Sequence, residues 1–238
     1  MHALRCPHVS FAAAVVVLKE DPTQHTDNGR EFVTAAAEIP SSQRPIPVLV
    51  RAYGDSAAAN ALLERKSGAR LLVSGDVALS KGDEDAGPDR KEPEQPIITA
   101  TVVCPGYDDQ YLCEVSIVGR VGSEPREADK STKRSVAINR YLPSPDGGDP
   151  IEITDWYGCR AFGKTRERFS RVDIGALVQV SGSFSQMTSA SGSPYVELKI
   201  RSLRVHKGRG NSNPAGGTAA VGYDQASFEG GNDIHNDW

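Results

Sequence analysis

The strongest constraint on the fold of this chain is an internal repeat. Residues 47–75 and residues 156–182 each contain an alternating apolar run ending in an aromatic residue and glycine, a helix-compatible stretch, a glycine, a second apolar run and a final glycine. The glycines are Gly54, Gly68 and Gly75 in the first copy and Gly163, Gly175 and Gly182 in the second. Self-similarity over about a hundred residues indicates two copies of one small domain.

The chain divides into two domains and a tail. Its 238 residues suit two small domains. We place the first domain at residues 9–105 and the second at residues 110–206. From residue 207 onward the sequence loses periodicity and fills with Gly, Asn, Ser and Ala. Such a segment cannot bury enough apolar surface to order itself, so residues 207–238 are predicted to form a disordered tail with an acidic tip.

Each domain is predicted to contain five strands, with a short helix between the third and the fourth. In the first domain the strands are expected at residues 11–18, 32–39, 45–53, 69–74 and 97–103, and the helix at 56–66. In the second they are expected at residues 111–121, 134–141, 151–162, 176–184 and 195–205, and the helix at 164–171. Polar stretches at residues 81–96, 122–133 and 142–150, the Asn28-Gly29 pair and a tip at residues 187–194 predict loops and turns.

This element order is the layout of the OB fold, a five-stranded Greek-key barrel that often binds oligonucleotides. The predicted fold class is therefore all-β, with two tandem OB barrels followed by the tail.

Composition argues against several other classes. No apolar run approaches the roughly 18 residues of a membrane span. Residues 9–18 resemble the apolar part of a signal peptide, but Lys19 and Glu20 follow at once without a cleavage site, so we interpret them as a first strand. The four cysteines lack a CxxC spacing, which favours reduced, mostly buried thiols over a zinc site. We expect a cytoplasmic, nucleoid-associated protein.

The sequence shows no sign of catalysis. It contains no recognisable pairing of nucleophile and base, no phosphate-cradling loop and no metal-ligand spacing. We expect no enzymatic activity, no cofactor and no metal.

Charge is distributed unequally between the two domains. The whole chain carries −4, but residues 9–110 hold 10 Lys and Arg against 16 Asp and Glu, a balance of −6. Residues 111–206 hold 14 against 11, a balance of +3. A polyanion would therefore prefer the second domain.

The strand at residues 151–162 contains the most informative side chains. Alternation in a strand places Trp156, Arg160 and Phe162 on one face, with Gly158 between the aromatic residues, and the set Tyr157, Cys159 and Ala161 on the other. Aromatic rings interleaved with cations are what sequence-tolerant binding of single strands requires. Periodicity alone leaves the opposite arrangement open, in which Trp156 and Phe162 form the barrel core.

Several segments resemble bacterial single-stranded DNA-binding proteins. Residues 154–157 (TDWY) leading to residues 161–164 (AFGK) resemble the third strand of that family. Residues 117–122 (IVGRVG) resemble its first strand, residues 135–140 (SVAINR) its second, and the spacing from Gly175 to Gly182 fits its fourth. The first domain is similar but more divergent, with Asp21-Pro22 and residues 26–29 (TDNG) matching the first turn of the family.

The resemblance implies a set of binding residues. Trp156, Phe162 and Tyr141 fall at or near base-stacking positions. Phosphate contacts are implied for Arg160, Lys164, Lys133, Arg134 and Arg140, with solvated surface charge as the alternative. The family often has an aromatic residue at the last hairpin, where this chain has Met187.

The first domain departs from the pattern. Arg51 and Tyr53 occupy the positions of Arg160 and Phe162, but Pro47 stands where Trp156 would be. Together with the charge of −6, this predicts that the first domain binds nucleic acid weakly or is mainly architectural.

The resemblance also implies partners. Proteins of this family end in an acidic tip that docks into replication and repair proteins, here Asp233, Ile234, Asp237 and Trp238. A basic-rimmed apolar pocket would take Trp238, and the alternative is a merely solubilising tail. Members with two such domains per chain form dimers, so a homodimer is expected.

The expected function is sequence-tolerant binding of single-stranded DNA, which would protect single strands during DNA replication, recombination and repair. Two alternatives stay open: a protein-interaction or assembly factor with little DNA affinity, such as a primosome-type accessory or a degenerate paralogue, and an RNA-binding OB protein.

Overall fold

The computed structural model describes residues 9–27, 29–79, 95–109, 111–142, 150–189 and 192–206. The predicted turn residue Asn28, most of the loops at 81–96 and 142–150, Cys6 and the whole tail with its tip residues lie outside the described residues. Both repeats lie in one compact unit of the chain.

The first repeat contains six strands and one helix: β1 (Ser10–Leu18), β2 (Thr23–Asp27), β3 (Arg30–Ile39), β4 (Ile46–Tyr53), α1 (Ala57–Leu63), β5 (Arg70–Leu79) and β6 (Pro96–Pro105). Its strand order is β2-β3-β4-β6-β5-β1, and β3 also pairs with β1, which closes a five-stranded barrel. The strand β2 is an added hairpin partner of β3. Every strand predicted for this repeat is confirmed, and Ser56 caps α1 through its side-chain oxygen, as its position before the helix favours.

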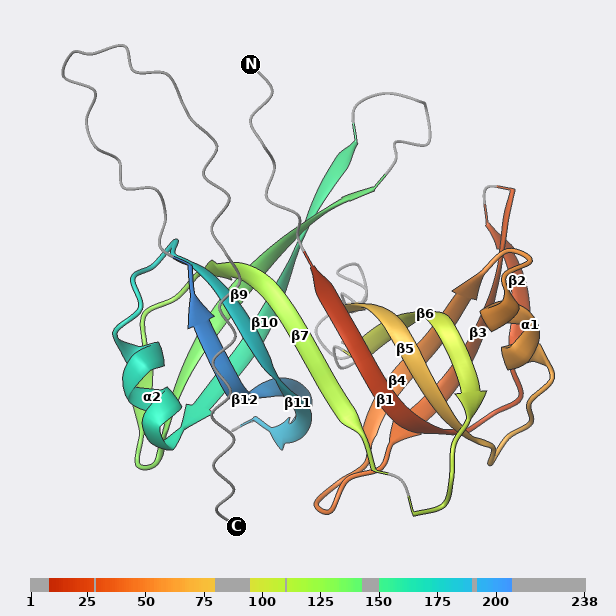
Figure 1. Ribbon diagram of the computed structural model, residues 1–238, viewed down its shortest axis with the longest axis horizontal. Coiled ribbons are helices and arrows are strands. Elements are labelled where there is room, and N and C mark those ends of the chain that lie inside the picture. The colour runs from red at the N-terminus through yellow and green to blue at the C-terminus, as the bar shows by residue number, and fades with distance from the viewer. Residues whose placement is uncertain are drawn as a thin grey trace, which may run out of the picture. The chain divides into compact units, whose positions relative to one another are not determined.

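The second repeat follows the same plan: β7 (Cys113–Val121), β8 (Arg126–Ala128), β9 (Ser131–Leu142), β10 (Ile151–Phe162), α2 (Gly163–Ser170), β11 (Leu177–Thr188) and β12 (Pro194–Val205). Here β7 pairs with β9 to close the barrel. In both barrels the strand before the helix runs parallel to the last strand, β4 to β6 and β10 to β12. The all-β fold with two tandem OB barrels is thus confirmed (Figure 1).

Two sequence predictions were wrong in detail. Residues 122–133 were predicted to be a loop, but they contain β8 and the start of β9 because a short hairpin pairs Arg126 with Lys133. The hairpin tip at residues 187–194 is also shorter than predicted, since β11 runs to Thr188 and β12 begins at Pro194.

The glycines of the repeat have equivalent structural roles. Gly68 and Gly175 have φ angles of +84° and +82°, a region that side chains with a Cβ rarely adopt. Gly75 and Gly182 lie at register shifts, where a Cβ would stand 2.0 Å from a carbonyl oxygen of the neighbouring strand in both barrels. The spacing that revealed the duplication is therefore required by the backbone of each barrel.

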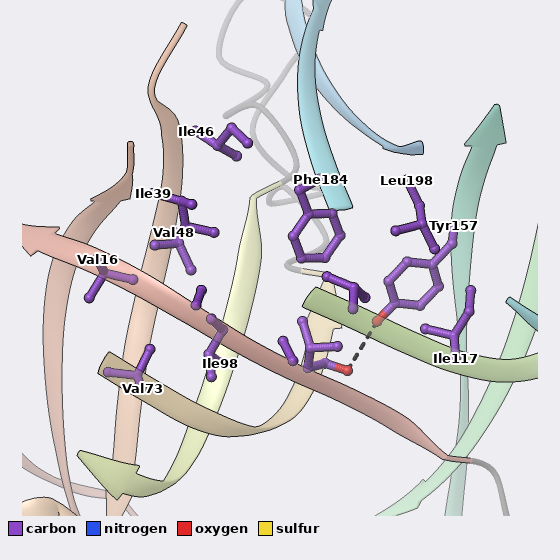
Figure 2. Packing of buried hydrophobic residues seen from close by; sticks show 14 of the residues in the cluster. Val16, Ile39, Ile46, Val48, Val73, Ile98, Ile117, Tyr157, Phe184 and Leu198 are labelled. Carbon is purple, nitrogen blue, oxygen red and sulfur yellow. Dashed lines mark hydrogen bonds between the residues drawn. The ribbon is translucent and has the colours of Figure 1, made fainter. Parts of the chain in front are cut away.

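The first strands of the two repeats join the barrels. β1 and β7 pair antiparallel, with Phe11 opposite Ser116 and Ala13 opposite Glu114. The barrels also meet through a buried side chain: the hydroxyl of Tyr157 in β10 donates a hydrogen bond of 3.0 Å to the backbone oxygen of Val77 in β5, drawn as a dashed line in Figure 2. Burial raises the pKa of Tyr157, so the hydroxyl stays protonated and keeps this hydrogen bond.

The cysteines are free thiols in the described part of the chain. Cys159 is fully buried, Cys113 is half-buried and Cys104 is exposed, so the prediction of mostly buried thiols is wrong for Cys104. No group of three or more His, Cys, Asp or Glu in the described residues could hold a metal ion. Within the described ranges, no helix is long and apolar enough to cross a membrane.

Candidate nucleic-acid interface

The outward side of β10 and its neighbours β9 and β12 forms the surface that we name the β10 face. The register places Trp156 opposite Ala137, Arg160 opposite Lys133 and Phe162 opposite Ser131. Trp156 is 52% exposed and Phe162 is 40% exposed, whereas Tyr157, Cys159 and Ala161 are buried. The predicted assignment of the two sides of β10 is confirmed, and the arrangement with Trp156 in the core is wrong.

Trp156 is held from one side by a glycine. A Cβ built on Gly122, which follows β7, would stand 2.2 Å from Cζ3 of the indole ring. The indole therefore rests directly on the backbone of Gly122, while its other surface faces solvent. An aromatic ring fixed in this way loses little conformational freedom when a base stacks on it.

A buried carboxylate organises the cations of the β10 face. Glu197 in β12 accepts hydrogen bonds from Nε and Nη2 of Arg160, at 2.6 and 3.3 Å, and also pairs with Lys133. Burial alone would raise the pKa of Glu197, but the hydrogen bonds from Arg160 and Lys133 outweigh it and hold this pKa below its usual value. Two cations and one anion leave this cluster with one positive charge, in fixed positions between the two exposed rings.

Two more residues, Lys199 and Tyr195, belong to the face and were not predicted from the sequence. Lys199 lies opposite Arg160 in β12, and its Nζ is 5.4 Å from the centroid of the Phe162 ring. Tyr195 lies under Lys133, whose Nζ is 4.6 Å from its ring centroid. Alternation along β12 puts Tyr195, Glu197 and Lys199 on one side, and this period of two could have identified them.

Tyr141 and Lys164 lie at the two ends of the β10 face. Tyr141 is opposite Glu152 and donates a hydrogen bond of 3.1 Å to its Oε1, and its ring is partly exposed. Lys164 is exposed in the first turn of α2, two residues after Phe162. Both positions are compatible with the predicted contacts.

The predicted phosphate contact at Arg134 is not supported, because its side chain is buried. Its guanidinium donates to the backbone oxygens of Ser123 and Phe169, each at 2.9 Å, and to that of Val172. Burial lowers the pKa of Arg134, and three carbonyls use its donors. Arg134 therefore connects α2 and the loop after β7 to the barrel through hydrogen bonds, and we no longer propose it as a phosphate contact.

The predicted phosphate contact at Arg140 is not supported either. It lies opposite Ile153, on the side of β9 away from Trp156. Its Nη2 donates to Asp155 Oδ1 at 3.0 Å, its Nε donates to Oδ2, and Asp155 is buried. This hydrogen bond raises the pKa of Arg140 and occupies its donors, so its role is structural.

The equivalent side of the first barrel, which we name the β4 face, contains Arg51 and Tyr53. Tyr53 lies opposite Phe32, and Phe32 lies opposite His25. The Phe32 ring stacks on His25 with centroids 5.2 Å apart and meets Tyr53 edge-on at 6.1 Å. Arg51 is over both the Phe32 and the Tyr53 ring, at 5.4 and 5.9 Å. Arg51 and Tyr53 were predicted from the sequence, whereas Phe32 and His25 were not.

Arg51 lacks the counterion that Arg160 has. The residue opposite Arg51 in β6 is Thr99, so Ile97 stands at the position of Glu197. The buried Nε of Arg51 has no hydrogen-bond partner among the residues that the structure describes, and its Nη1 donates to the Tyr53 hydroxyl at 3.3 Å. The β4 face thus keeps an arginine and aromatic rings, but it lacks the tryptophan and the carboxylate that orders the cations.

No family model and no curated protein matches this chain. Among solved structures, it is similar to the wild-type single-stranded DNA-binding protein from Thermus aquaticus, with a TM-score of 0.60 and 15% identity over 91% of this chain and 98% of that one. A deletion mutant of the Thermus aquaticus protein gives a TM-score of 0.57 and 14% identity over 84% of this chain and 96% of that one. At these identities the likeness shows the fold, and it extends over both barrels.

Proposed function

We propose that this protein binds single-stranded DNA with little sequence preference. The observation that carries the proposal is the β10 face, where Trp156 and Phe162 are exposed on either side of a fixed group of cations. The Thermus aquaticus proteins of the same fold bind single-stranded DNA. Every base has a π-face, so stacking on exposed rings tolerates any sequence, at about 1–3 kcal/mol per base.

The proposed mechanism combines base stacking on aromatic rings with attraction of phosphates to cations. Bases stack on Trp156, Phe162 and Tyr141, while phosphates approach Lys133, Arg160, Lys199 and Lys164. Because Glu197 already neutralises part of the charge, we expect stacking to supply much of the affinity and the salt dependence to be moderate. Such a face binds and covers a single strand without changing it chemically.

We further propose that the protein protects single strands during DNA replication, recombination and repair. The tip residues Asp233, Ile234, Asp237 and Trp238 would recruit replication and repair proteins. This part of the proposal comes from the sequence resemblance alone, because the tip lies outside the described residues. It is tested by asking whether removal of the tip abolishes capture of such partners while leaving DNA affinity intact.

A homodimer is part of the same proposal. The outward side of β1 and β7 carries the apolar or small side chains of Phe11, Ala13 and Val118 beside the charged Glu114 and Arg120, and Phe11 is 42% exposed. A continuous sheet with such a surface is suited to pack against a second copy. Light scattering of the full chain is expected to give twice the monomer mass, and Phe11→Asp is expected to give the monomer.

An assembly factor with little DNA affinity is the second candidate. Its support is that Arg160 and Lys133 share an internal counterion and that residues 9–110 carry −6. One titration separates the two candidates. In a Trp238→Phe variant, Trp156 is the sole tryptophan, and oligo(dT) is expected to quench its emission, less strongly at higher salt.

Unchanged emission at micromolar oligonucleotide would contradict DNA binding and favour the assembly factor. Repeating the titration with an RNA of matching sequence tests the RNA-binding alternative.

A further inference from the structure

The β10 face does not end at Phe162, because a groove continues from there between the two barrels. Its nearer part, about 340 Å³, is lined by Phe162, Lys199 and Met187 of the second barrel and by residues 41–43 of the first. Its farther part, about 530 Å³, shares Ser41, Phe184 and Lys199 with the nearer part. The shared residues make the two parts one continuous groove.

The farther part of the groove ends at an exposed aromatic ring. Tyr111, which precedes β7, is 71% exposed and lines this end together with Leu112. The guanidinium of Arg70, from β5 of the first barrel, lies 5.9 Å from the centroid of the Tyr111 ring. Phe184 and Ile46, one from each barrel, line the same part, and both side chains are labelled in Figure 2. The groove therefore leads from one exposed aromatic residue to another.

The charges of the groove favour an anionic ligand. The two carboxylates that line it are both paired, Glu197 with Arg160 and Lys133, and Glu114 with Arg201. Lys199 is exposed and lines both parts. Arg44 follows the lining residues 41–43 of the first barrel and donates a hydrogen bond of 3.0 Å to Thr188 Oγ1 of the second barrel. Lys199 thus lines the groove, and Arg44 lies next to its lining residues in the chain.

We infer that the groove binds the part of a DNA single strand that extends beyond Phe162, with a base stacked on Tyr111 and a phosphate near Lys199. This inference rests on the proposed function, since it extends the same strand. It makes Tyr111 a further stacking residue and gives the first barrel a direct role through Arg44 and residues 41–43. It also provides a continuation of the binding surface in a chain whose last hairpin has Met187 in place of an aromatic residue.

The linker between the barrels offers a matched control. Tyr107 is 69% exposed and lies four residues before Tyr111, but it does not line the groove. Tyr111→Ala and Tyr107→Ala are compared in the full chain by the fluorescence anisotropy of labelled oligo(dT). The two oligonucleotides contain about 4 and about 16 nucleotides, the two ends of the range that one OB fold covers.

The inference predicts that Tyr111→Ala weakens binding of the longer oligonucleotide by about fivefold or more, the loss of one stacked base. Binding of the shorter one, which fills only the β10 face, is expected to stay within about twofold of the unmodified chain. Tyr107→Ala is expected to change neither affinity. As a second readout, photo-cross-linking with 5-iododeoxyuridine oligonucleotides is expected to label the peptide that contains Tyr111.

Three results would count against the inference, and they are distinguishable. Equal affinities of Tyr111→Ala and Tyr107→Ala for the longer oligonucleotide, with no cross-link at Tyr111, would overturn the groove and leave the proposed function standing. If Tyr111→Ala weakened the binding of both oligonucleotide lengths equally, Tyr111 would act on the strand that the β10 face already binds. This result would also overturn the groove. Failure of the unmodified chain to bind either oligonucleotide would overturn the proposed function, and the groove with it.

Discussion

The two barrels share their strand pairing and glycine positions but differ in their outward side chains. Each has the same closing strand pairs, the same parallel strand neighbours and the same glycine positions. On the outward side, Trp156 and Glu197 in the second barrel correspond to Pro47 and Ile97 in the first. The backbone of a repeat is constrained by its turns and close approaches, whereas its outward side chains are free to diverge. The functional difference between the barrels therefore lies in the side chains of each face.

The carboxylate is as important to this difference as the tryptophan. In the second barrel, Glu197 fixes Arg160 and Lys133 in place. In the first barrel, the contacts of Arg51 within the described part of the chain are two aromatic rings and one hydroxyl. We therefore expect changes on the β10 face to have larger effects on DNA binding than equivalent changes on the β4 face.

The largest effect is expected from Trp156→Ala. Removing one stacked base costs about 1–3 kcal/mol, which corresponds to a roughly 5- to 150-fold weaker affinity for oligo(dT). Because the ring is 52% exposed, the melting temperature should shift by only a few degrees, about what 1 kcal/mol produces. Fluorescence anisotropy and thermal melting measure the two effects, and a change in stability without a change in affinity would contradict the role of Trp156.

Glu197→Gln is expected to lower stability and to change its pH dependence. The loss should be about 1–2 kcal/mol, since Arg160 and Lys133 keep part of their exposure to solvent. The native pKa of Glu197 lies below its ordinary value of 4.5, so its contribution is present above that pH and is lost as the pH falls through the native pKa.

Denaturant unfolding of both chains at several pH values measures this contribution. The difference in unfolding free energy should be constant above about pH 5.5 and should shrink below pH 4.5. A difference that is the same at all pH values would contradict the pairing. The variant also leaves one more positive charge without a counterion. The slope of log K for oligo(dT) against log salt concentration should therefore become steeper, by about one unit at most.

Gly122→Ala tests whether the backbone positions Trp156. The added methyl group would occupy the place of the indole edge, so the ring must move, and the affinity should fall by about fivefold. Gly158→Ala is the matched control, because its Cβ would meet its neighbours at ordinary distances of 3.7 and 3.8 Å. The emission maximum of Trp156 should shift in the first variant and not in the second; equal behaviour of the two would refute this role of Gly122.

The smallest effect is expected from Ile97→Glu, which gives Arg51 the counterion that Arg160 has. If the first barrel contributes little to binding, the affinity for oligo(dT) should change by less than about twofold. Isothermal titration calorimetry can detect a larger loss. Such a loss would show that Arg51 contacts phosphate, and it would make the two barrels more alike than we propose.

The sequence was sufficient for the repeat, the five barrel strands of each domain and the division of the β10 side chains into two sets, and the neighbouring cations and the family resemblance indicated which set faces outward. It was not sufficient for the set of cations. Neighbouring residues of a strand point to opposite sides, so Lys133 and Arg134 could not both lie beside Trp156, and neither could Arg140 and Tyr141. Which member of each pair faces outward depends on the register of β9 against β10, which a single sequence does not reveal.

The remaining omissions have a similar cause. The period of two along β12 groups Glu197 with Tyr195 and Lys199, but its pairing with Arg160 follows only from the parallel placement of β12 beside β10, because the two strands lie far apart in the sequence. Phe32 and His25 joined Tyr53 through the pairing of β2, β3 and β4. Tyr111 lines a groove whose walls come from both barrels, so the pattern of a single repeat does not predict it. Contacts between distant segments, and not local patterns, created these features.

The most direct test of the unequal barrels compares Phe162→Ala with Tyr53→Ala. Both residues end the strand before the helix and precede an equivalent glycine, Gly163 or Gly54, and both are exposed. The affinity of each full-length variant for the same oligo(dT) is measured at one salt concentration. We predict a loss of about fivefold or more for Phe162→Ala and of less than about twofold for Tyr53→Ala. Equal losses, or a greater loss for Tyr53→Ala, would contradict the claim that the second barrel is the main DNA-binding barrel.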